Sequence, residues 1–236
     1  DGMVLHLKAD EGVVESNDVV IRWEDQSGNG NDALNVDYSG TLDESALPVL
    51  EPNAINDNPV LRFDGINDGL MIWDDPVNRD FNVEPLGLTG SEGATILGVF
   101  LFDSGSSYAG QRPFGHTGQS DTDIFGLAFN NNGYPEYWNT YGTVTWWDEL
   151  YDGNEGSVIW AGRSLRGEDQ LGPYQLSEMW VDAATPRFRY GYEDANLSAQ
   201  SPIGVGCFEY NGYRQNLTAC GIAEIIIYNR SLSDEE

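Results

Sequence analysis

Short apolar runs separated by turn-forming residues dominate the hydrophobic pattern of this chain. The runs are rich in β-branched and aromatic residues, and Gly, Asn, Asp and Pro end them, which is typical of strands. No amphipathic helical pattern longer than about two turns interrupts the series. The pattern predicts strands over Met3–Ala9, Val19–Trp23, Pro59–Asp64, Leu70–Trp73, Ala94–Phe102, Asp123–Asn130, Thr143–Trp147, Ser157–Leu165, Arg187–Tyr192, Ile203–Tyr210 and Gly221–Tyr228.

Many short strands with recurring turn signals indicate an all-β sandwich. We expect a short C-terminal helix capped by Ser231, with acids from Asp234 onward in its first turn. The stretch 37–58 has little regular pattern and reads as an irregular insertion. Because no composition break or internal repeat divides the chain, we expect one domain over residues 1–236.

The net charge of the chain limits the classes of partner that it can bind. Lys and Arg number 11 against 39 Asp and Glu, a net charge of −28 in 236 residues. Such a chain repels a phosphate backbone, so nucleic-acid binding is excluded. The longest apolar run, Ala94–Phe102, is too short to cross a bilayer, so no membrane insertion is expected.

Acidity with a single lysine, Lys8, suits a protein that stays soluble in salt, as extracellular and cell-surface proteins do. Since the sequence begins at Asp1 and not at a methionine, we expect a domain excised from a larger protein.

Acidic side chains in Gly- and Asn-rich loops predict bound Ca²⁺, which takes six to eight oxygen ligands or so. The expected metal ligands are Asp121, Asp123, Asp148, Asp152 and Asn154. Two turns offer further candidates: Asp25 with Asn29 and Asp32, and Asp64 with Asn67 and Asp68. At turns, however, Asp and Asn also stabilise the chain by bonding its own backbone.

An aromatic cluster adjoins the acidic loops. We predict ligand contacts from Tyr137, Trp138, Tyr141 and Trp146. Aromatic faces stack on sugar rings and also grip peptide side chains, although Tyr and Trp can equally pack in a sandwich core. Neighbouring residues of a strand point to opposite faces, so only one of Trp146 and Trp147 is expected to reach the core. Because the expected calcium ligands and the aromatic cluster adjoin in the sequence, we predict a ligand site between residues 121 and 154.

The two cysteines, Cys207 and Cys220, either form a disulfide across a loop or are two buried thiols in adjacent strands. We expect the disulfide, because the Asn211-Gly212 turn between them can bring antiparallel partners together. A zinc site is excluded, since neither His6 nor His116 lies close to the cysteines in the sequence.

Four segments resemble a known family. These are Met3-Val-Leu-His-Leu-Lys-Ala-Asp10, Trp23-Glu-Asp-Gln-Ser-Gly-Asn-Gly-Asn-Asp-Ala33, Pro59-Val-Leu-Arg-Phe-Asp-Gly65 and the closing stretch from Gly221 to Glu235. They are similar to the concanavalin A-like, laminin-G-type jelly rolls of secreted bacterial proteins. The resemblance brackets nearly the whole chain and implies an antiparallel two-sheet jelly-roll sandwich.

Enzymes on such scaffolds carry signatures that this chain lacks. No glutamate has an aspartate two places later, as the Glu-x-Asp-x-Glu motif of glucanases requires, and neither histidine lies in the Gln-x-His motif of lyases. We therefore expect no catalytic activity.

In acidity and fold signature the chain resembles the calcium-dependent peptide-binding domains of repeats-in-toxin adhesins. This implies a monomeric module of a large secreted adhesin that binds a peptide or protein terminus on a target cell surface. The alternative is a carbohydrate-binding module appended to a polysaccharide-degrading enzyme, with a glycan as ligand. A spacer domain without a ligand is a third possibility.

Overall fold

The computed structural model describes residues 1–36, 45–75, 77, 85–88, 93–102, 110–117, 124–130, 132, 134–139, 142–145, 156–182, 187–191, 202–210, 213–215 and 217–236. Within these ranges the chain forms strands and turns and contains no helix, which confirms the all-β prediction. The strands are β1 (Met3–Lys8), β2 (Val13–Ser16), β3 (Val19–Trp23), β4 (Ala33–Leu34), β5 (Val49–Ile55), β6 (Asn58–Asp64), β7 (Leu70–Ile72), β8 (Ala94–Phe102), β9 (Phe114–Thr117), β10 (Ile124–Phe129), β11 (Pro135–Asn139), β12 (Gly142–Thr145), β13 (Gly156–Asp169), β14 (Gly172–Val181), β15 (Arg187–Gly191), β16 (Ile203–Val205), β17 (Phe208–Tyr210), β18 (Tyr213–Gln215) and β19 (Ala219–Tyr228).

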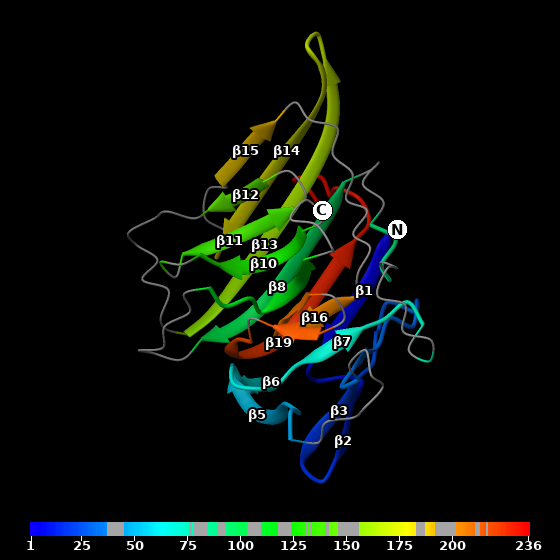
Figure 1. Ribbon diagram of the computed structural model, residues 1–236, viewed down its shortest axis with the longest axis vertical. Helices are drawn as coiled ribbons and strands as arrows, with labels where there is room; N and C mark the ends of the chain where they lie inside the picture. The colour runs from blue at the N-terminus through cyan, green and yellow to red at the C-terminus, as the bar shows by residue number, and fades with distance from the viewer. Residues whose placement is uncertain are drawn as a thin grey trace.

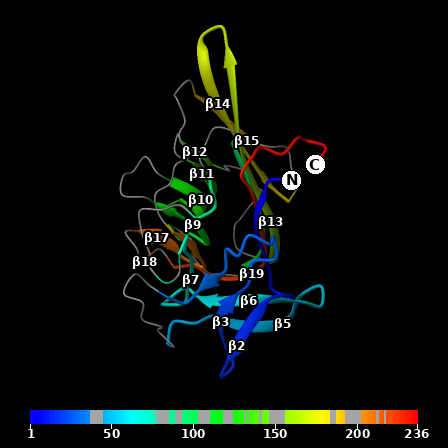
Figure 2. The same cartoon turned by 90° about the vertical axis from the view of Figure 1, so that its right-hand side faces the viewer.

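The strands form two sheets. Sheet A has the order β15-β14-β13-β8-β19-β6-β5, and β1 pairs with the far part of β19 (Figure 1). Sheet B has the order β12-β11-β10-β9-β16-β7-β4-β3-β2, with β17 and β18 attached at β9. Their pairing is antiparallel except for the parallel pair β17 and β9. Figure 2 shows the sheets side by side, as in a sandwich.

The core lies between the sheets, as strand β8 illustrates. Ala94, Ile96, Phe100 and Phe102 are buried, whereas Leu97, Val99 and Leu101 between them are half-buried on the opposite face. Side chains of a strand alternate between its two faces, so one face of sheet A packs against sheet B and the other is its outer face. The inner face is dense in aromatic rings, with Trp160 packed against both Phe100 and Phe129.

The hairpin of β13 and β14 extends beyond the rest of sheet A (Figures 1 and 2). Ten residue pairs join its two strands, from Trp160 with Val181 to Asp169 with Gly172. Leu171 in its turn is 79% exposed. The hairpin therefore positions residues of β14 next to β13 on the outer face of sheet A.

Strand β19 brings the two ends of the chain together. It pairs with β8 along most of its length and with β1 through residues from Glu224 to Tyr228. Beyond it, the Asn229 N–H donates to the Gly2 carbonyl at 3.0 Å, and the Arg230 guanidinium donates to the Asp1 carbonyl at 2.7 Å. The segment after β19 consequently starts beside the N-terminus of the chain.

Among the differences from the sequence-based prediction, three have a clear physical reason. Residues 49–55, expected to be irregular, form β5, because their partner β6 supplies the hydrogen bonds that their weak pattern did not announce. The run Ile203–Tyr210 divides into β16 and β17 at Gly206, whose φ is 73°. The short C-terminal helix is absent, since residues 231–236 form only a turn and the Ser231 hydroxyl bonds the Ser164 carbonyl instead of capping a helix.

The structure also lacks the disulfide predicted between Cys207 and Cys220. Both residues are buried as thiols, which was the second alternative. Cys220 lies in β19 of sheet A and belongs to the inner core. Cys207 lies between β16 and β17 of sheet B, with its Sγ 3.8 Å from the Leu70 carbonyl oxygen. The two side chains thus belong to different sheets and different packing environments.

Candidate ligand-binding pocket

Most of the predicted site lies outside the described residues. This applies to Asp121, Asp123, Tyr141, Trp146, Asp148, Asp152 and Asn154. Trp138 lies in β11 as the backbone partner of Gly126 and Thr143, and its side chain is not among those described.

Tyr137 packs in the core instead of making the predicted ligand contact. Its side chain is fully buried, and its hydroxyl lies 2.7 Å from the Ser164 hydroxyl across the two sheets. The ring lies against Gly162, where a Cβ atom would come within 2.3 Å of it. The glycine therefore makes room for the tyrosine, and both serve packing between β11 and β13.

The Asp25 carboxylate, one of the further metal candidates, organises its own loop. It accepts hydrogen bonds from the backbone N–H groups of His6, Ser27 and Asn31 at 2.9, 2.9 and 3.1 Å. The Ser27 hydroxyl donates to it at 2.7 Å. Four donors on one carboxylate pin the loop against β1, which is a structural role for the Trp23–Ala33 motif.

The second candidate turn is built in the same manner. The Asp64 carboxylate accepts bonds from the N–H groups of Ile66, Asn67 and Asp68. Burial pushes the pKa of Asp64 upward, but these three bonds outweigh it and leave the pKa below its ordinary value. Burial raises the pKa of Asp68 to about 6. The hydrogen bond that the Asp68 carboxylate accepts from the Asp64 N–H and the charge of Arg214 oppose this rise.

In the part of the chain that the structure describes, no three His, Cys, Asp or Glu side chains gather as metal ligands. The same residues contain no helix with the length and apolar character needed to cross a membrane.

A pocket of about 430 Å³ lies on the outer face of sheet A. Its floor comes from three neighbouring strands and its wall from the segment after β19. The lining residues are Thr95, Leu97, Ala161, Arg163, Glu178, Trp180, Leu232, Ser233, Asp234 and Glu236. The register places Leu97 beside Ala161 and Ala161 beside Trp180, so an apolar strip crosses β8, β13 and β14.

Arg163 joins the floor to the wall. Its Nε donates to the Glu178 carboxylate at 2.8 Å, and its guanidinium carbon lies 5.0 Å from the centroid of the Trp180 ring. Its Nη1 donates to the Leu232 carbonyl at 2.7 Å, and its Nη2 lies 2.8 Å from Asp234. Burial lowers the pKa of Arg163, but the bonds to both carboxylates outweigh burial and raise it.

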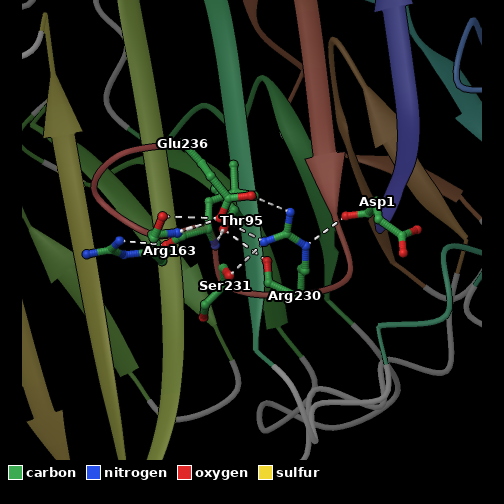
Figure 3. Close-up of polar contacts among 8 residues, drawn as sticks. Asp1, Thr95, Arg163, Arg230, Ser231 and Glu236 are labelled. Carbon is green, nitrogen blue, oxygen red and sulfur yellow. Dashed lines mark hydrogen bonds and ion pairs between the residues drawn. The ribbon is translucent and has the colours of Figure 1, made fainter.

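The wall is fixed by further hydrogen bonds (Figure 3). The Thr95 hydroxyl donates to the Arg230 carbonyl at 3.0 Å and accepts from the Leu232 N–H at 3.0 Å. In Figure 3 the segment after β19 passes in front of β8 and β13, with sheet B behind them. Thr95, Arg163 and Arg230 together hold this segment against the sheet.

The end of the wall closes on itself. The Arg230 guanidinium makes two bonds to the Glu236 carboxylate, at 2.7 and 3.0 Å, and the Ser233 N–H donates to Glu236 at 3.1 Å. These bonds lower the pKa of Glu236 to about 2, and those from Arg230 have a larger effect than that from Ser233. The Glu236 carboxylate at the rim of the pocket is thus ionised and paired with Arg230.

The pocket combines an aromatic and aliphatic floor with a polar rim. Its lining holds one arginine against three acids, Glu178, Asp234 and Glu236. Sites of this size bind small molecules or short polymer segments through apolar contact and a few placed polar groups. A ring laid on Trp180 would have hydrogen-bonding groups of both kinds at its edge.

Sequence reasoning missed this site because β14 was not among the predicted strands. Its signal is the alternation Ser177, Glu178, Met179, Trp180, in which the core positions are separated by a charge and an aromatic ring. On a strand, this spacing puts Glu178 and Trp180 on one face. The pairing partner of the strand, which only the fold supplies, adds Arg163.

No protein-family model matches the sequence, and no curated protein matches it. Solved structures do resemble the fold. The binding domain of Paraclostridial mosquitocidal protein 1 has a TM-score of 0.61 and 12% identity, over 100% of this chain and 50% of that chain. Domain 4 of AbnA, a GH43 extracellular arabinanase from Geobacillus stearothermophilus in complex with arabinotriose, has a TM-score of 0.58 and 10% identity, over 98% and 94%.

The binding domain of botulinum neurotoxin serotype D has a TM-score of 0.57 and 13% identity, over 99% of this chain and 49% of that chain. This chain therefore spans about half the length of the two toxin domains. At such identities the similarity is one of fold, and it supports a β-sandwich shared with binding domains of toxins and of a glycoside hydrolase.

Proposed function

We propose that this chain is a non-catalytic glycan-binding module whose ligand lies on Trp180 in the pocket of sheet A. The observation that carries the proposal is the pocket itself, with an apolar strip under a rim of charged side chains. Sugar rings offer an apolar face to an indole and hydroxyl groups to carboxylates and guanidinium groups.

A neutral glycan fits this rim better than the peptide terminus that the adhesin resemblance suggested. One guanidinium faces three carboxylates, and Arg163 is already paired with two of them. Even with Arg230 counted against Glu236, a peptide carboxylate entering the pocket would meet more carboxylates than guanidinium groups, and no uncommitted cation among the lining residues that the structure describes. Hydroxyl groups carry no such cost. The structural similarity to an arabinanase domain solved with arabinotriose also supports a glycan.

The wider setting belongs to the same proposal. The sandwich is a concanavalin A-like jelly roll and a single domain over residues 1–236. It is a monomeric part of a larger extracellular protein, either an adhesin or a polysaccharide-degrading enzyme. The high acidity of the chain and its likeness to a domain of an extracellular arabinanase support this placement.

Calcium remains part of the proposal, with Asp121, Asp123, Asp148, Asp152 and Asn154 as its ligands. Its support is the charge of −28, which a bound cation would reduce locally. A calcium ion that binds only the folded state adds about 2.7 kcal/mol to the free energy of unfolding when its concentration is a hundredfold above Kd. Millimolar calcium is then expected to raise Tm by several degrees, and more than sodium chloride of equal ionic strength. An equal rise in both salts would show screening and remove calcium from the account.

The test of glycan binding uses a panel of neutral hexasaccharides: laminarihexaose, cellohexaose, xylohexaose, mannohexaose and arabinohexaose. Calorimetric titration of the intact chain is expected to detect at least one of them. Trp180→Ala should abolish that binding, because the apolar platform is lost. Tyr174→Ala is the matched control, since Tyr174 is a half-buried aromatic on the same strand and face but outside the pocket. Unchanged binding by a folded Trp180→Ala variant would refute the proposed site.

A further inference from the structure

A second hollow lies on the outer face of sheet A. Its volume is about 260 Å³, and strands β1, β5, β6, β8 and β19 contribute to it. The lining residues are Lys8, Asp10, Ile55, Asn58, Pro59, Val99, Ala223 and Glu224. Lys8 and Glu224 are register partners of β1 and β19, so this hollow covers the part of the sheet next to the pocket.

The register of the sheet makes the two hollows neighbours. Leu97 lines the pocket and Val99 lines the second hollow, and both lie on β8 with one residue between them. Two residues along a strand span about 7 Å and return to the same face. Glu224 of the second hollow pairs with Val99, while Ala161 of the pocket pairs with Leu97. The lining of one hollow therefore continues into the lining of the other.

The surface that joins them is apolar. Ile159 pairs with Val99 and lies two residues before Ala161, and its side chain is 54% exposed although β13 lies inside the sheet. Ile226 pairs with Leu97 and is half-buried. Ile159 and the half-buried Leu97, Val99 and Ile226 form a contiguous apolar patch in the middle of a sheet face, the kind of surface that a ligand or partner covers.

Charge selects among the possible occupants. The second hollow has Lys8 against Asp10 and Glu224, and Lys8 already lies 3.4 Å from Asp10 and 3.2 Å from Glu11. Among the described residues, the two hollows together hold two cations, Lys8 and Arg163, and five acids. Both cations are ion-paired. A polyanionic glycan would be repelled along the whole path, whereas an uncharged chain can bond to acids at both ends.

We infer that the two hollows are subsites of one groove, which takes an extended segment of an uncharged polysaccharide instead of a single terminal sugar. This inference rests on the proposed function and deepens it. Trp180 holds one sugar of the chain, Leu97, Val99 and Ile159 contact the middle, and the hollow at Lys8 and Glu224 holds a further sugar.

The test compares chain lengths. Calorimetric titration uses the intact protein with each hexasaccharide of the panel and with the corresponding disaccharides. Wild type is expected to bind the preferred hexasaccharide at least about tenfold more tightly than the disaccharide. Ile159→Ser removes the apolar bridge, and Asn58→Trp fills the second hollow from an exposed position at the start of β6. Each should bring the hexasaccharide Kd close to the disaccharide Kd and leave the disaccharide Kd unchanged.

Leu171→Ser is the matched control, because it removes another exposed aliphatic side chain, from the hairpin turn outside both hollows. It should leave both Kd values as in wild type. Equal affinity for the two chain lengths, or no effect of Ile159→Ser and Asn58→Trp, would overturn the groove while leaving the Trp180 pocket intact. Absence of binding to the whole panel would overturn both. A concentration-dependent dimer that Ile159→Ser abolishes would assign this face to a second copy of the chain and overturn the groove.

Discussion

The guanidinium carbon of Arg163 lies 5.0 Å from the centre of the Trp180 ring, across the pair of strands that ends in the exposed hairpin. The same guanidinium bonds Glu178 beside Trp180 and reaches Asp234 in the segment after β19. One side chain thus fixes the aromatic platform, its acidic neighbour and the wall of the pocket.

Arg163→Ala is expected to destabilise the protein and loosen the wall. Removing one member of a buried ion pair leaves its carboxylate partner uncompensated, which costs about 3–5 kcal/mol. Urea unfolding measures the loss, and hydrogen exchange of residues 230–236 should speed up. Arg62→Ala is the control, because the ion pair between Arg62 and Glu51 is more exposed than that of Arg163. This substitution should cost about 1 kcal/mol or less. Equal losses in the two variants would contradict this role of Arg163.

Asp25→Ala is expected to unfold the loop between Trp23 and Ala33. Four donors lose a charged acceptor, and the free energy of unfolding should fall by about 3 kcal/mol. Glu24→Ala, which removes an exposed carboxylate paired with Arg22, should cost about 1 kcal/mol or less. Urea denaturation checks both variants. A loss below 1 kcal/mol or so for Asp25→Ala would show that the loop does not depend on this carboxylate.

Asp68 makes stability depend on pH in a defined window. Its pKa of about 6 lies above the ordinary value of 3.8, so the folded state binds more protons than the unfolded state between these two values. The contribution of Asp68 to the unfolding free energy therefore falls as pH rises from about 4 to 6 and is lowest at neutral pH.

Asp68→Asn keeps an oxygen for the Asp64 N–H and removes the charge. It should stabilise the protein by about 1–2 kcal/mol at neutral pH and by much less near pH 4. Urea unfolding at both pH values, on protein stripped of metal with EDTA at neutral pH and exchanged into metal-free buffers, measures the difference without a metal contribution. A constant difference between variant and wild type at the two pH values would contradict the raised pKa.

The cysteines give a direct chemical readout. Because Cys207 and Cys220 are buried thiols, the native protein should react slowly with a thiol reagent. After denaturation without a reducing agent, two thiols per chain should titrate. Absence of titratable thiols in that sample would restore the disulfide that the sequence suggested.

The sequence predicts the strands that carry strong local patterns. Ala94–Phe102 is predicted to the residue, and Val19–Trp23 likewise, because each is a run dominated by β-branched, aromatic and other apolar residues between clear turn signals. Val49–Ile55 and Gly172–Val181 escape detection, since polar residues interrupt them and their hydrogen bonds come from long-range partners. Residue propensities report only local conformational preference, whereas these two strands form because of their tertiary pairing.

The candidate pocket depends on pairing even more strongly. Thr95, Arg163 and Trp180 are far apart in the sequence, and only the order β14-β13-β8 brings them to one face. The segment that closes the pocket is predicted from the sequence to be a helix capped by Ser231. Ser233 and Glu236 have the spacing of a capping box and bond each other, but the segment forms only a turn. The local hydrogen bonding of this segment could be predicted from the sequence, but its packing against sheet A could not.

The most direct test of the glycan site is the indole N–H signal of Trp180 in a ¹H–¹⁵N correlation spectrum, assigned by its loss in Trp180→Phe. The chain has seven tryptophans, and Trp23 and Trp160 are fully buried internal references. Titration with the hexasaccharide that binds best should shift the Trp180 signal in a saturable manner while the signals of Trp23 and Trp160 stay in place. A stationary Trp180 signal together with shifts of other tryptophan signals would contradict the account, and would put the ligand elsewhere on the sandwich.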